Sequence, residues 1–532
     1  MKKLQVWLPL LFAIVMIIGM LIGFRLRGNI RPTNLFMARK PTPVQEVMDL
    51  INMNYVDSIS TDTIGNDAIE GMLTHLDPHS VYIPAVDVSE VNEDLQGNFE
   101  GIGVEFQIFD DTVNVMNVLA GGPSDKANLK VGDKFIKVGD SVVAGNGITN
   151  DRIRKLLRGP GASDVAITLL RVGNGTKPLQ VHITRGTIPL PSVDVAYMIN
   201  KDIGYIRINR FSETTHAEFA QALMKLQQQG LQRLVLDLRG NGGGILQESI
   251  ECADDFLDGD KLIVYTVGAR SPKVEYRCRR DGLFEKGKLV LLTDEGTASA
   301  SEVLTGALQD WDRATIIGRR TFGKGLVQQP FQLSDGSALR LTIARYYTPT
   351  GRSIQKPYDK GHDDYNEEVI KRFHDGEVLH GDTTTKHAGP SYKTLGPEKR
   401  TVYGGGGITP DIFIGFDTST FSRNTTALYV DGTLNRFVYA YYIQHLPTFQ
   451  NFKGPADFIT GFHDEEGLWR SLTTYVAKDT VNLASIPAKE RDVLKHRLKA
   501  LMARQIWRTE GYYEVSNAYD PVVSKALEVV SK

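Results

Sequence analysis

The spacing of apolar residues divides the chain into segments of different period. Apolar residues at helical spacing predict two short helices, at 44–51 and 64–76. Alternating apolar and polar residues then predict short strands at 104–108, 113–118, 134–138, 165–170 and 179–183. Residues 99–185 are therefore expected to form a small β-rich domain.

Beyond residue 186 apolar strands alternate with helices. Strands are predicted at 203–208, 234–238, 289–292 and 327–333, and helices at 215–229, 245–256 and 298–312. This alternation is typical of a layered α/β domain, which we place at 186–415. Residues 356–400 are polar and charged and are expected to be a solvated excursion from it.

The end of the chain is expected to be a helical C-terminal extension, residues 416–532, because 434–446 and 487–508 have helical patterns. The beginning differs: Leu4–Phe24 is a run of 21 residues without a charge. At helical rise this run is long enough to cross a bilayer. We expect residues 1–27 to be an uncleaved signal anchor, with a cleaved signal peptide as the alternative. Residues 28–98 are expected to be a linker and an N-terminal helical region.

Composition excludes some classes of protein and of site. The 532 residues carry a net charge of −2, so no basic surface indicates a nucleic-acid partner. Cys252 and Cys278 could form one disulfide or remain two buried thiols. His75, Asp77 and His79 have metal-binding side chains, but they surround a proline turn and no further ligand cluster follows. No metal site and no cofactor is expected.

Candidate chemistry begins with Ser299, in the segment Gly296–Glu302. It follows a predicted strand and starts a predicted helix, where free amides favour negative charge. The amide of Ala300 is the natural first donor to an oxyanion, and Gly243 and Gly244 could supply a second. A helix-capping role for this serine is the structural alternative.

Lys324, between Gly323 and Gly325, favours a catalytic role for Ser299 over a helix-capping role. A lysine acts as a general base only if its pKa falls well below its usual value of about 10.4, and burial can achieve this. If the segment is a strand, Lys324 and Gln328 share one face, and the glutamine can hold the neutral amine by hydrogen bonding. A Ser299–Lys324 pair with Gln328 assisting therefore predicts a hydrolase that needs no histidine.

Two nucleotide-binding patterns are incomplete in this chain. Residues 318–324 match the start of a P-loop, but Gly325 stands where serine or threonine is required and a strand follows. The loop Gly240–Gly244 lacks the dinucleotide spacing, and no acid ends the next strand. This loop fits an oxyanion site better.

Within the β-rich domain, Gly101, Ile102, Gly103 and Val104 open a strand, and turn residues follow at 121–133. These residues resemble a PDZ domain. In that fold such a loop offers successive backbone amides to the terminal carboxylate of a peptide, which adds as a strand to the sheet edge. An apolar carboxyl terminus would be its natural ligand.

Several segments in order resemble one family, the C-terminal processing peptidases or tail-specific proteases. They are LDLRGNGGG, TASASEVLTGALQD, GRRTFGKGLVQQ, LTIARYYTPTGRSIQ and GGGGITPDI, after the PDZ-like domain. The resemblance covers about residues 40–415. It implies a crotonase-like or ClpP-like core with Ser299 as nucleophile, Lys324 as general base and Gln328 assisting. Ser301 is the competing serine, and the family pattern favours Ser299.

The resemblance further implies a serine endopeptidase that recognises protein C-terminal tails through the PDZ domain and cleaves them through an acyl-enzyme. It also implies a location at the bacterial inner membrane, with the catalytic domain in the periplasm. The segment before GGGGITPDI and the tail after 416 depart from the pattern, and both are candidates for homo-oligomerisation or regulation. A PDZ adaptor on an inactive core and an acyl-CoA enzyme of crotonase type are the alternatives.

Overall fold

The computed structural model describes residues 7, 12–20, 42–171, 175, 177–381, 389–416, 422–477, 482, 483 and 486–532. Its contacts divide it into two units, residues 1–71 and 72–532. The first unit contains α2 (Pro43–Asn54) and most of α3 (Thr61–Leu73), close to the two predicted helices.

The predicted membrane anchor, residues 4–24, lies largely outside the described residues. Residues 12–20 are helical and exposed. Within the ranges that the structure describes, no helix is both long and apolar enough to cross a membrane. The anchor stays a prediction from the sequence.

A six-stranded sheet forms the core of the second unit, in the order β10-β11-β12-β15-β16-β21. The strands are β10 (Val193–Met198), β11 (Ile203–Ile208), β12 (Arg233–Asp237), β15 (Lys288–Thr293), β16 (Thr315–Gly318) and β21 (Ile412–Phe413). All neighbours are parallel except β10 and β11. The three strands predicted between 203 and 292 are confirmed to within one residue at each end.

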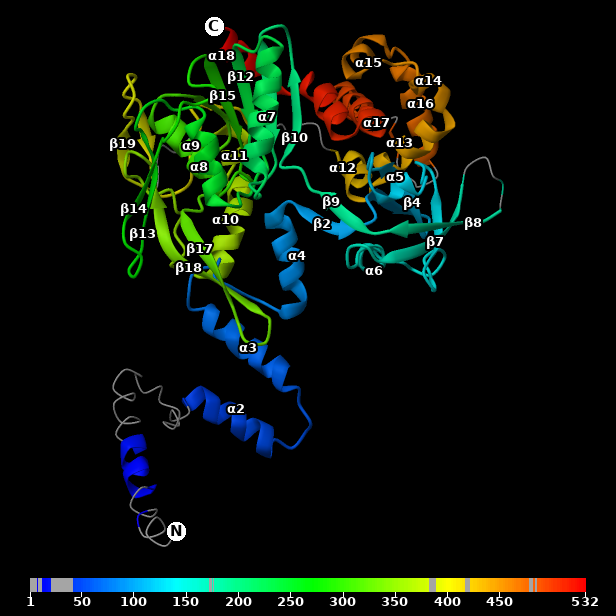
Figure 1. Cartoon of the computed structure of the whole chain (residues 1–532). Coiled ribbons are helices and arrows are strands. Elements are labelled where there is room, and N and C mark those ends of the chain that lie inside the picture. Colours follow the sequence, from blue (N-terminus) through cyan, green and yellow to red (C-terminus); the bar gives the residue numbers. More distant parts are fainter. Residues whose placement is uncertain are drawn as a thin grey trace. The chain divides into compact units, whose positions relative to one another are not determined.

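Both faces of this sheet are covered, which explains why its strands are nearly continuous runs of apolar residues. Leu234 and Leu236 of β12 face the cluster that includes α7 (Thr215–Gln228), α8 (Leu246–Asp254) and α9 (Ala300–Asp310). Val235 faces the opposite cluster, which contains α18 (Pro521–Ser531). Figure 1 shows α18 against β12 and β15, on the side away from α8 and α9. The last helix therefore belongs to the core sheet, although the sequence placed it in a separate extension.

A second sheet lies beside the first and carries part of the candidate site. Its order is β1-β18-β13-β14, and β17 also pairs with β18. The strands are β1 (Val81–Ile83), β13 (Leu262–Val267), β14 (Val274–Arg277), β17 (Leu326–Gln332) and β18 (Ala338–Tyr347). The strand predicted at 327–333 is confirmed as β17, displaced by one residue.

The β-rich domain has the predicted strands, in the order β3-β4-β5-β7-β8, with β6 beside β5. They are β3 (Val104–Phe109), β4 (Thr112–Val118), β5 (Lys134–Val138), β6 (Ser141–Val142), β7 (Asp164–Leu170) and β8 (Leu179–Thr184), with helices α5 (Pro123–Lys126) and α6 (Asn150–Leu157). We call this the PDZ-like domain. A two-stranded ribbon, β2 (Asn98–Gly101) with β9 (Gly186–Pro189), joins it to the core. Just before β2 lies α4 (Ala85–Gln96).

The prediction of a solvated excursion at 356–400 is wrong for much of that segment. It forms α10 (His362–His374), α11 (Glu377–His380) and β19 (Ser391–Lys393), which pairs with β20 (Thr401–Tyr403). Tyr365 is 1% exposed and Lys356 2%. The Lys356 ammonium donates to Glu368 and to the Tyr365 carbonyl, and packs over the ring of Phe322. Pairing of charges allows this polar sequence to be buried.

Residues 423–517 form a helical region with its own apolar core. Its helices are α12 (Arg423–Val430), α13 (Thr433–Gln444), α14 (Leu446–Phe449), α15 (Pro455–Gly461), α16 (Glu465–Val476) and α17 (Ala488–Asn517). The helices predicted at 434–446 and 487–508 are confirmed as α13 and α17, and α17 continues beyond the prediction. Figure 1 shows this region beside the PDZ-like domain, where Tyr439 of α13 packs against Phe109.

Candidate active site

Ser299 and Lys324 line the same cavity, which has a volume of about 520 Å³. Its walls include α4, the glycine loop 242–244, the start of α9, and the adjacent strands β17 and β18. Gln328 and Ala300 also line it. The structure thus brings the predicted site residues to one cavity from segments up to 85 residues apart in sequence, Gly243 to Gln328.

Ser299 lies between strand β15 and helix α9, in a strained turn. Its φ is 56° and its ψ is −116°, a backbone conformation that residues other than glycine rarely adopt. Such strain persists only where the surroundings enforce it, and it is concentrated at functional sites. The carbonyl of Ser299 accepts a hydrogen bond from the hydroxyl of Tyr346 at 3.0 Å. The turn holds the residue half-exposed at the cavity wall.

Ser301, the competing serine, has a different environment. Its side chain is fully buried, and its hydroxyl donates to the carbonyl of Asn241 at 3.0 Å. It does not line the cavity. Its geometry is that of a structural serine that attaches α9 to the glycine loop.

The glycine loop approaches Ser299 closely. A Cβ on Gly243 would lie 2.8 Å from the Ser299 Cβ and 2.9 Å from the Ala300 nitrogen, so only glycine fits there. However, the Gly243 amide donates to the Asn241 side chain at 2.9 Å. In this conformation Gly243 lets the loop approach Ser299 closely, but its amide is bound to Asn241. Gly243 is therefore not the oxyanion donor that the sequence predicts. The amides of Ala300 and Gly244 have no partner among the described residues.

Lys324 precedes β17, and its amine donates to the Gln328 side-chain oxygen at 2.8 Å. The Gln328 amide nitrogen in turn donates to the carbonyl of His79. Because that bond engages the nitrogen, the oxygen of Gln328 faces the lysine. Strand alternation alone does not produce this geometry, since β17 has a bulge at Val327 and Gln328.

The electrostatic environment lowers the pKa of Lys324. Burial is the main cause, and the positive charge of Arg340 is the next. Both disfavour the ammonium form. His79 is neutral at pH 7, because burial and then the charge of Lys324 lower its pKa to about 4.

Glu302 is hydrogen-bonded to the backbone of both Ser299 and Lys324. It is fully buried on α9. Its carboxylate accepts hydrogen bonds from the amides of Ser299, Gly323 and Lys324 at 2.8 to 2.9 Å, and from the Thr321 hydroxyl. Burial raises the pKa of Glu302 to about 7. One side chain therefore fixes the backbone of both Ser299 and Lys324, the predicted nucleophile and the predicted base.

Replacing Glu302 by glutamine is expected to lower the free energy of unfolding at pH 5 by about 1 to 3 kcal/mol, because an amide NH₂ cannot accept from these donors. The pKa of Glu302 is about 7 in the folded chain against 4.5 as its ordinary value. Between these values the folded state binds more protons than the unfolded state, so this group contributes stability below about pH 4.5 that is lost as the pH rises to about 7. Between pH 5 and pH 8 the difference should move against wild type by about 2.5 kcal/mol, so the gap over Glu302→Gln should close or reverse.

Denaturant unfolding of both proteins at pH 5 and pH 8 measures this difference. A gap that is equal at the two pH values would show that Glu302 does not titrate in this range.

Sequence reasoning missed Glu302, Tyr346, Arg340 and the carbonyl of His79. The spacing Ser299-x-x-Glu302 is that of a capping box and could have indicated the first. The others come from distant segments. The hydroxyl of Tyr346, for example, bridges the carbonyls of Ser299 and Lys324.

The loop predicted to bind a tail carboxylate lies outside this cavity. Gly103 has a φ of 74° and Ile102 is 2% exposed. Gly103 and Val104 line a different cavity of about 550 Å³. Gly101 ends β2, directly after α4, so the loop and a wall of the catalytic cavity are neighbours in sequence.

The remaining candidates concern metals and thiols. Asp77 accepts from the hydroxyls of Ser80 and Thr342 at 2.7 and 2.8 Å, so it holds the turn before β1 against β18. The described ranges contain no group of three or more side chains arranged for a metal ion. Cys252 and Cys278 are free, buried thiols, so the disulfide alternative is wrong.

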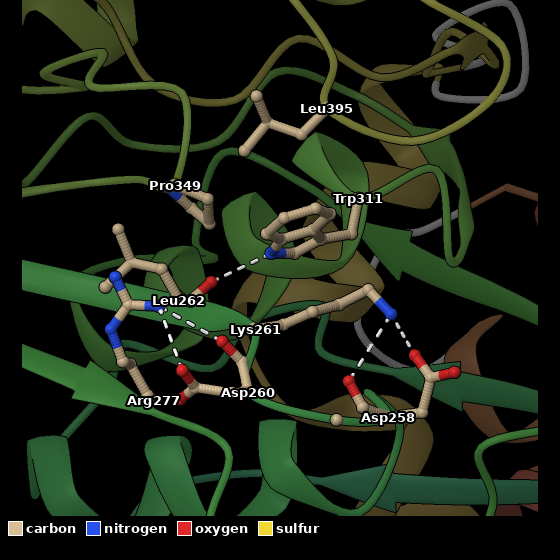
Figure 2. A pocket seen from close by; sticks show the side chains of 9 residues that line it. Asp258, Asp260, Lys261, Leu262, Arg277, Trp311, Pro349 and Leu395 are labelled. Atoms are coloured by element: carbon tan, nitrogen blue, oxygen red, sulfur yellow. Dashed lines mark hydrogen bonds and ion pairs between the residues drawn. The ribbon is translucent and has the colours of Figure 1, made fainter.

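A second hollow, of about 510 Å³, is lined by charged residues (Figure 2). Its ionised groups bind one another: Lys261 pairs with Asp258, and Arg277 lies 3.7 Å from the Asp260 carboxylate. The indole nitrogen of Trp311 donates to the Leu262 carbonyl at 2.8 Å. None of the predicted catalytic residues contributes to it.

Comparisons with known proteins match these features. The model of peptidase family S41 matches residues 202–362, and a family of unknown function, DUF8443, matches residues 425–508. A carboxy-terminal-processing protease of Bartonella bacilliformis is 34% identical over 314 residues, 58% of this chain and 71% of that protein. A probable CtpA-like serine protease of Staphylococcus epidermidis is 33% identical over 58% of this chain and 62% of its own length. The match thus spans about three fifths of the staphylococcal relative.

Solved structures give matches of the same kind. The photosystem II D1 C-terminal processing protease is 30% identical over 58% of this chain and 83% of that chain, with a TM-score of 0.33. A PDZ domain of the carboxy-terminal protease of Vibrio cholerae, solved in complex with peptide, is 35% identical over 18% of this chain and 99% of that domain, with a TM-score of 0.17.

The extent of the bacterial matches confirms the resemblance seen in the sequence. One third of the aligned residues are identical, over more than two thirds of the Bartonella protein. The chain belongs to peptidase family S41, among the carboxy-terminal-processing proteases, and is a serine-type peptidase.

Proposed function

We propose that this chain is an endopeptidase that takes up unstructured protein C-termini and cleaves them with a Ser299–Lys324 dyad. One observation carries the proposal: a half-exposed, strained serine and a partly buried lysine of lowered pKa line one cavity beside a glycine loop. Perturbed lysines in clefts are typical of active sites.

Each of the predicted catalytic residues at the cavity has a defined step in the proposed reaction. Neutral Lys324 leaves Gln328 and accepts the proton of the Ser299 hydroxyl while the serine oxygen bonds to the substrate carbonyl carbon. The amides of Ala300 and Gly244 stabilise the oxyanion. The C–N bond then breaks, and the lysine returns the proton to the leaving amine. Water then adds to the acyl carbon while the Lys324 amine takes its proton. The lysine returns this proton to the Ser299 oxygen as the acyl–oxygen bond breaks, which releases the acid and restores the neutral amine.

The cavity wall favours extended substrates with apolar side chains near the cleaved bond. Val88, Val91 and Leu95 on one face of α4 line it, together with Ile83 and Leu326. Burial of one apolar side chain of the substrate there would contribute about 1.5 to 3 kcal/mol. Folded substrates could not reach a site walled on several sides, so an unstructured tail is the suitable substrate.

The PDZ-like domain is proposed to hold the end of that tail at Gly101–Val104. Gly101 is paired with Gly186 in the β2–β9 ribbon, and Ile102 and Gly103 follow it at the start of β3. β3 ends the strand order of the described part of the sheet, so its outer edge can accept a further strand. Capture of the free carboxylate would deliver the chain upstream of it to the catalytic cavity.

The test compares two versions of one disordered protein, with a free C-terminal carboxylate and with a carboxamide. The purified chain should cleave both, with kcat/KM about 10-fold higher for the free carboxylate, since one charge-assisted contact contributes about 1.5 kcal/mol or more. Mass spectrometry of the products locates the cuts.

Two further outcomes would reject the proposal. If the purified chain cleaves neither version of the protein, an adaptor on an inactive core is favoured. Hydrolysis of an acyl-CoA thioester without peptide cleavage would favour a crotonase-type enzyme. Equal rates for both C-termini would retain the peptidase and remove tail recognition.

A further inference from the structure

The longest helix of the helical region breaks where it meets the PDZ-like domain. Within α17, Trp507 and Arg508 have non-helical backbone angles, and φ of Arg508 is 60° with ψ of −146°. Angles of this kind cost of order 1–3 kcal/mol in a residue other than glycine and occur where a ligand site or switch requires them. The break lies outside residues 202–362, which the peptidase model matches.

The side chain of Arg508 reaches the PDZ-like domain beside the carboxylate-binding loop. Its guanidinium donates to the carbonyl of Val118, the last residue of β4. Val118 pairs with Val104 across the β3–β4 ladder. Arg508 and Val104 also line the same two cavities, so the positive charge lies beside the last residue of the loop.

Two cavities meet at this point, of about 550 and 450 Å³. Both are lined by Val104, Glu105, Asn117 and Arg508. The smaller cavity has one wall from β3 and α6 and the other from α13 and α17. Residues 104–107 of β3 line it, which is room for about four residues of an added strand.

The smaller cavity carries a surplus of positive charge. Arg154 of α6 and Arg504 and Arg508 of α17 line it, against the single acidic residue Glu105. Arg504 and Arg508 form no ion pair with the described residues, and Arg154 has only Asp151 at 4.0 Å. Cationic side chains without acidic partners favour an anionic ligand.

The same cavity contains buried acceptors without donors. The side-chain oxygens of Gln107 on β3 and Gln505 on α17 have no hydrogen-bond partner in the described part of the chain. Both residues line the cavity, from opposite walls. Buried polar atoms are normally paired, and the N–H groups of an extended peptide between these walls would pair them.

We propose that the helical region forms the second wall of the tail-binding groove and selects protein C-termini with an acidic side chain among their last four residues. The terminal carboxylate lies at Gly103 and Val104 with Arg508 beside it. The acidic side chain lies between Arg154 and Arg504. This inference rests on the proposed capture of tails by the PDZ-like domain.

The test uses the full chain with Ser299→Ala, to prevent turnover, and fluorescence anisotropy with labelled ten-residue peptides. One peptide ends in an apolar residue and has aspartate at the third position from the end. A second has asparagine there, and a third has lysine. A fourth is the aspartate peptide with a C-terminal carboxamide.

Arg504→Ala should weaken binding of the aspartate peptide about 10-fold or more and leave the asparagine peptide unchanged. Arg504→Glu should reverse the preference and bind the lysine peptide best. Arg508→Gly, which suits the positive φ, should weaken the free-carboxylate peptides about 10-fold or more and the carboxamide peptide less than 3-fold. Arg491→Ala, on the same helix but outside the groove, is the matched control and should bind as the parent does.

Failure of this inference is distinguishable from failure of the proposed function. If all Arg504 and Arg508 variants bind like the parent while Gly103→Val abolishes binding, the helical region has no role and tail capture stands. Gly103→Val is the control for the loop, since φ is positive there and a Cβ would lie 3.0 Å from Ile188. If no peptide binds any protein, both the groove and the proposed tail capture are wrong.

Discussion

Replacing Ser299 by alanine is expected to lower kcat/KM for a disordered protein substrate by at least about 10⁴-fold, because the proposed acyl-enzyme forms on the Ser299 hydroxyl. The fold should persist, since the hydrogen bonds that hold the strained backbone do not involve the Ser299 side chain. Glu302 binds the Ser299 amide and Tyr346 binds its carbonyl. The measurement is the initial rate of substrate loss, beside a thermal unfolding curve for each protein.

Ser301→Ala is the matched control, two residues away on the same helix. It loses the buried hydrogen bond to Asn241, so it should unfold about 1 kcal/mol more easily and retain most of its activity. The assignment of Ser299 is wrong if Ser299→Ala cleaves at the wild-type rate. It is also wrong if Ser301→Ala is folded and inactive while Ser299→Ala is active.

Removing the titratable amine of Lys324 should have a comparable effect. Lys324→Ala and Lys324→Arg are both expected to lose at least about 10³-fold in the acylation rate, because arginine keeps the charge but cannot deprotonate. In the proposed mechanism the neutral amine of Lys324 is the active form. Burial and Arg340 lower its pKa, so the acylation rate should rise with pH to a plateau, with a midpoint below the ordinary lysine value of 10.5.

A second variant tests the assignment of that midpoint. Gln328→Glu would place a carboxylate beside the Lys324 amine, now 2.8 Å from the amide oxygen. The carboxylate stabilises the ammonium and should move the midpoint to higher pH, with little change in the plateau rate. Single-turnover kinetics across pH measure both quantities. An unchanged midpoint in folded Gln328→Glu would assign the titration to another group.

The sequence predicted the regular core well, because its strands have a strong local pattern. Apolar runs such as 234–238 are buried on both faces, and each became a strand within one residue of its predicted place. The predicted catalytic residues Ser299, Lys324 and Gln328 also line one cavity. Their roles remain predictions until the variants are measured.

The errors have a common physical origin in contacts between distant segments. The pattern of the polar segment 356–400 predicts solvent exposure, yet Arg372 is 3% exposed. Its guanidinium binds Glu368 and the carbonyls of Thr321 and Phe322. The amide of Gly243 was expected to face substrate, yet it binds the Asn241 side chain. No local pattern shows which buried partner a polar group will find.

Helix α18 has a consequence for how the protein is made. It covers one face of the core sheet, and Asp520 at its start binds Arg239 at 2.7 Å, next to the glycine loop that approaches Ser299. Ser299 leaves the ribosome more than 200 residues before this helix. Nascent chains fold from the N-terminus onward, so this face of the sheet stays uncovered until α18 has been synthesised. The core sheet, with the glycine loop at its edge, is thus expected to be complete only after the helical region has left the ribosome.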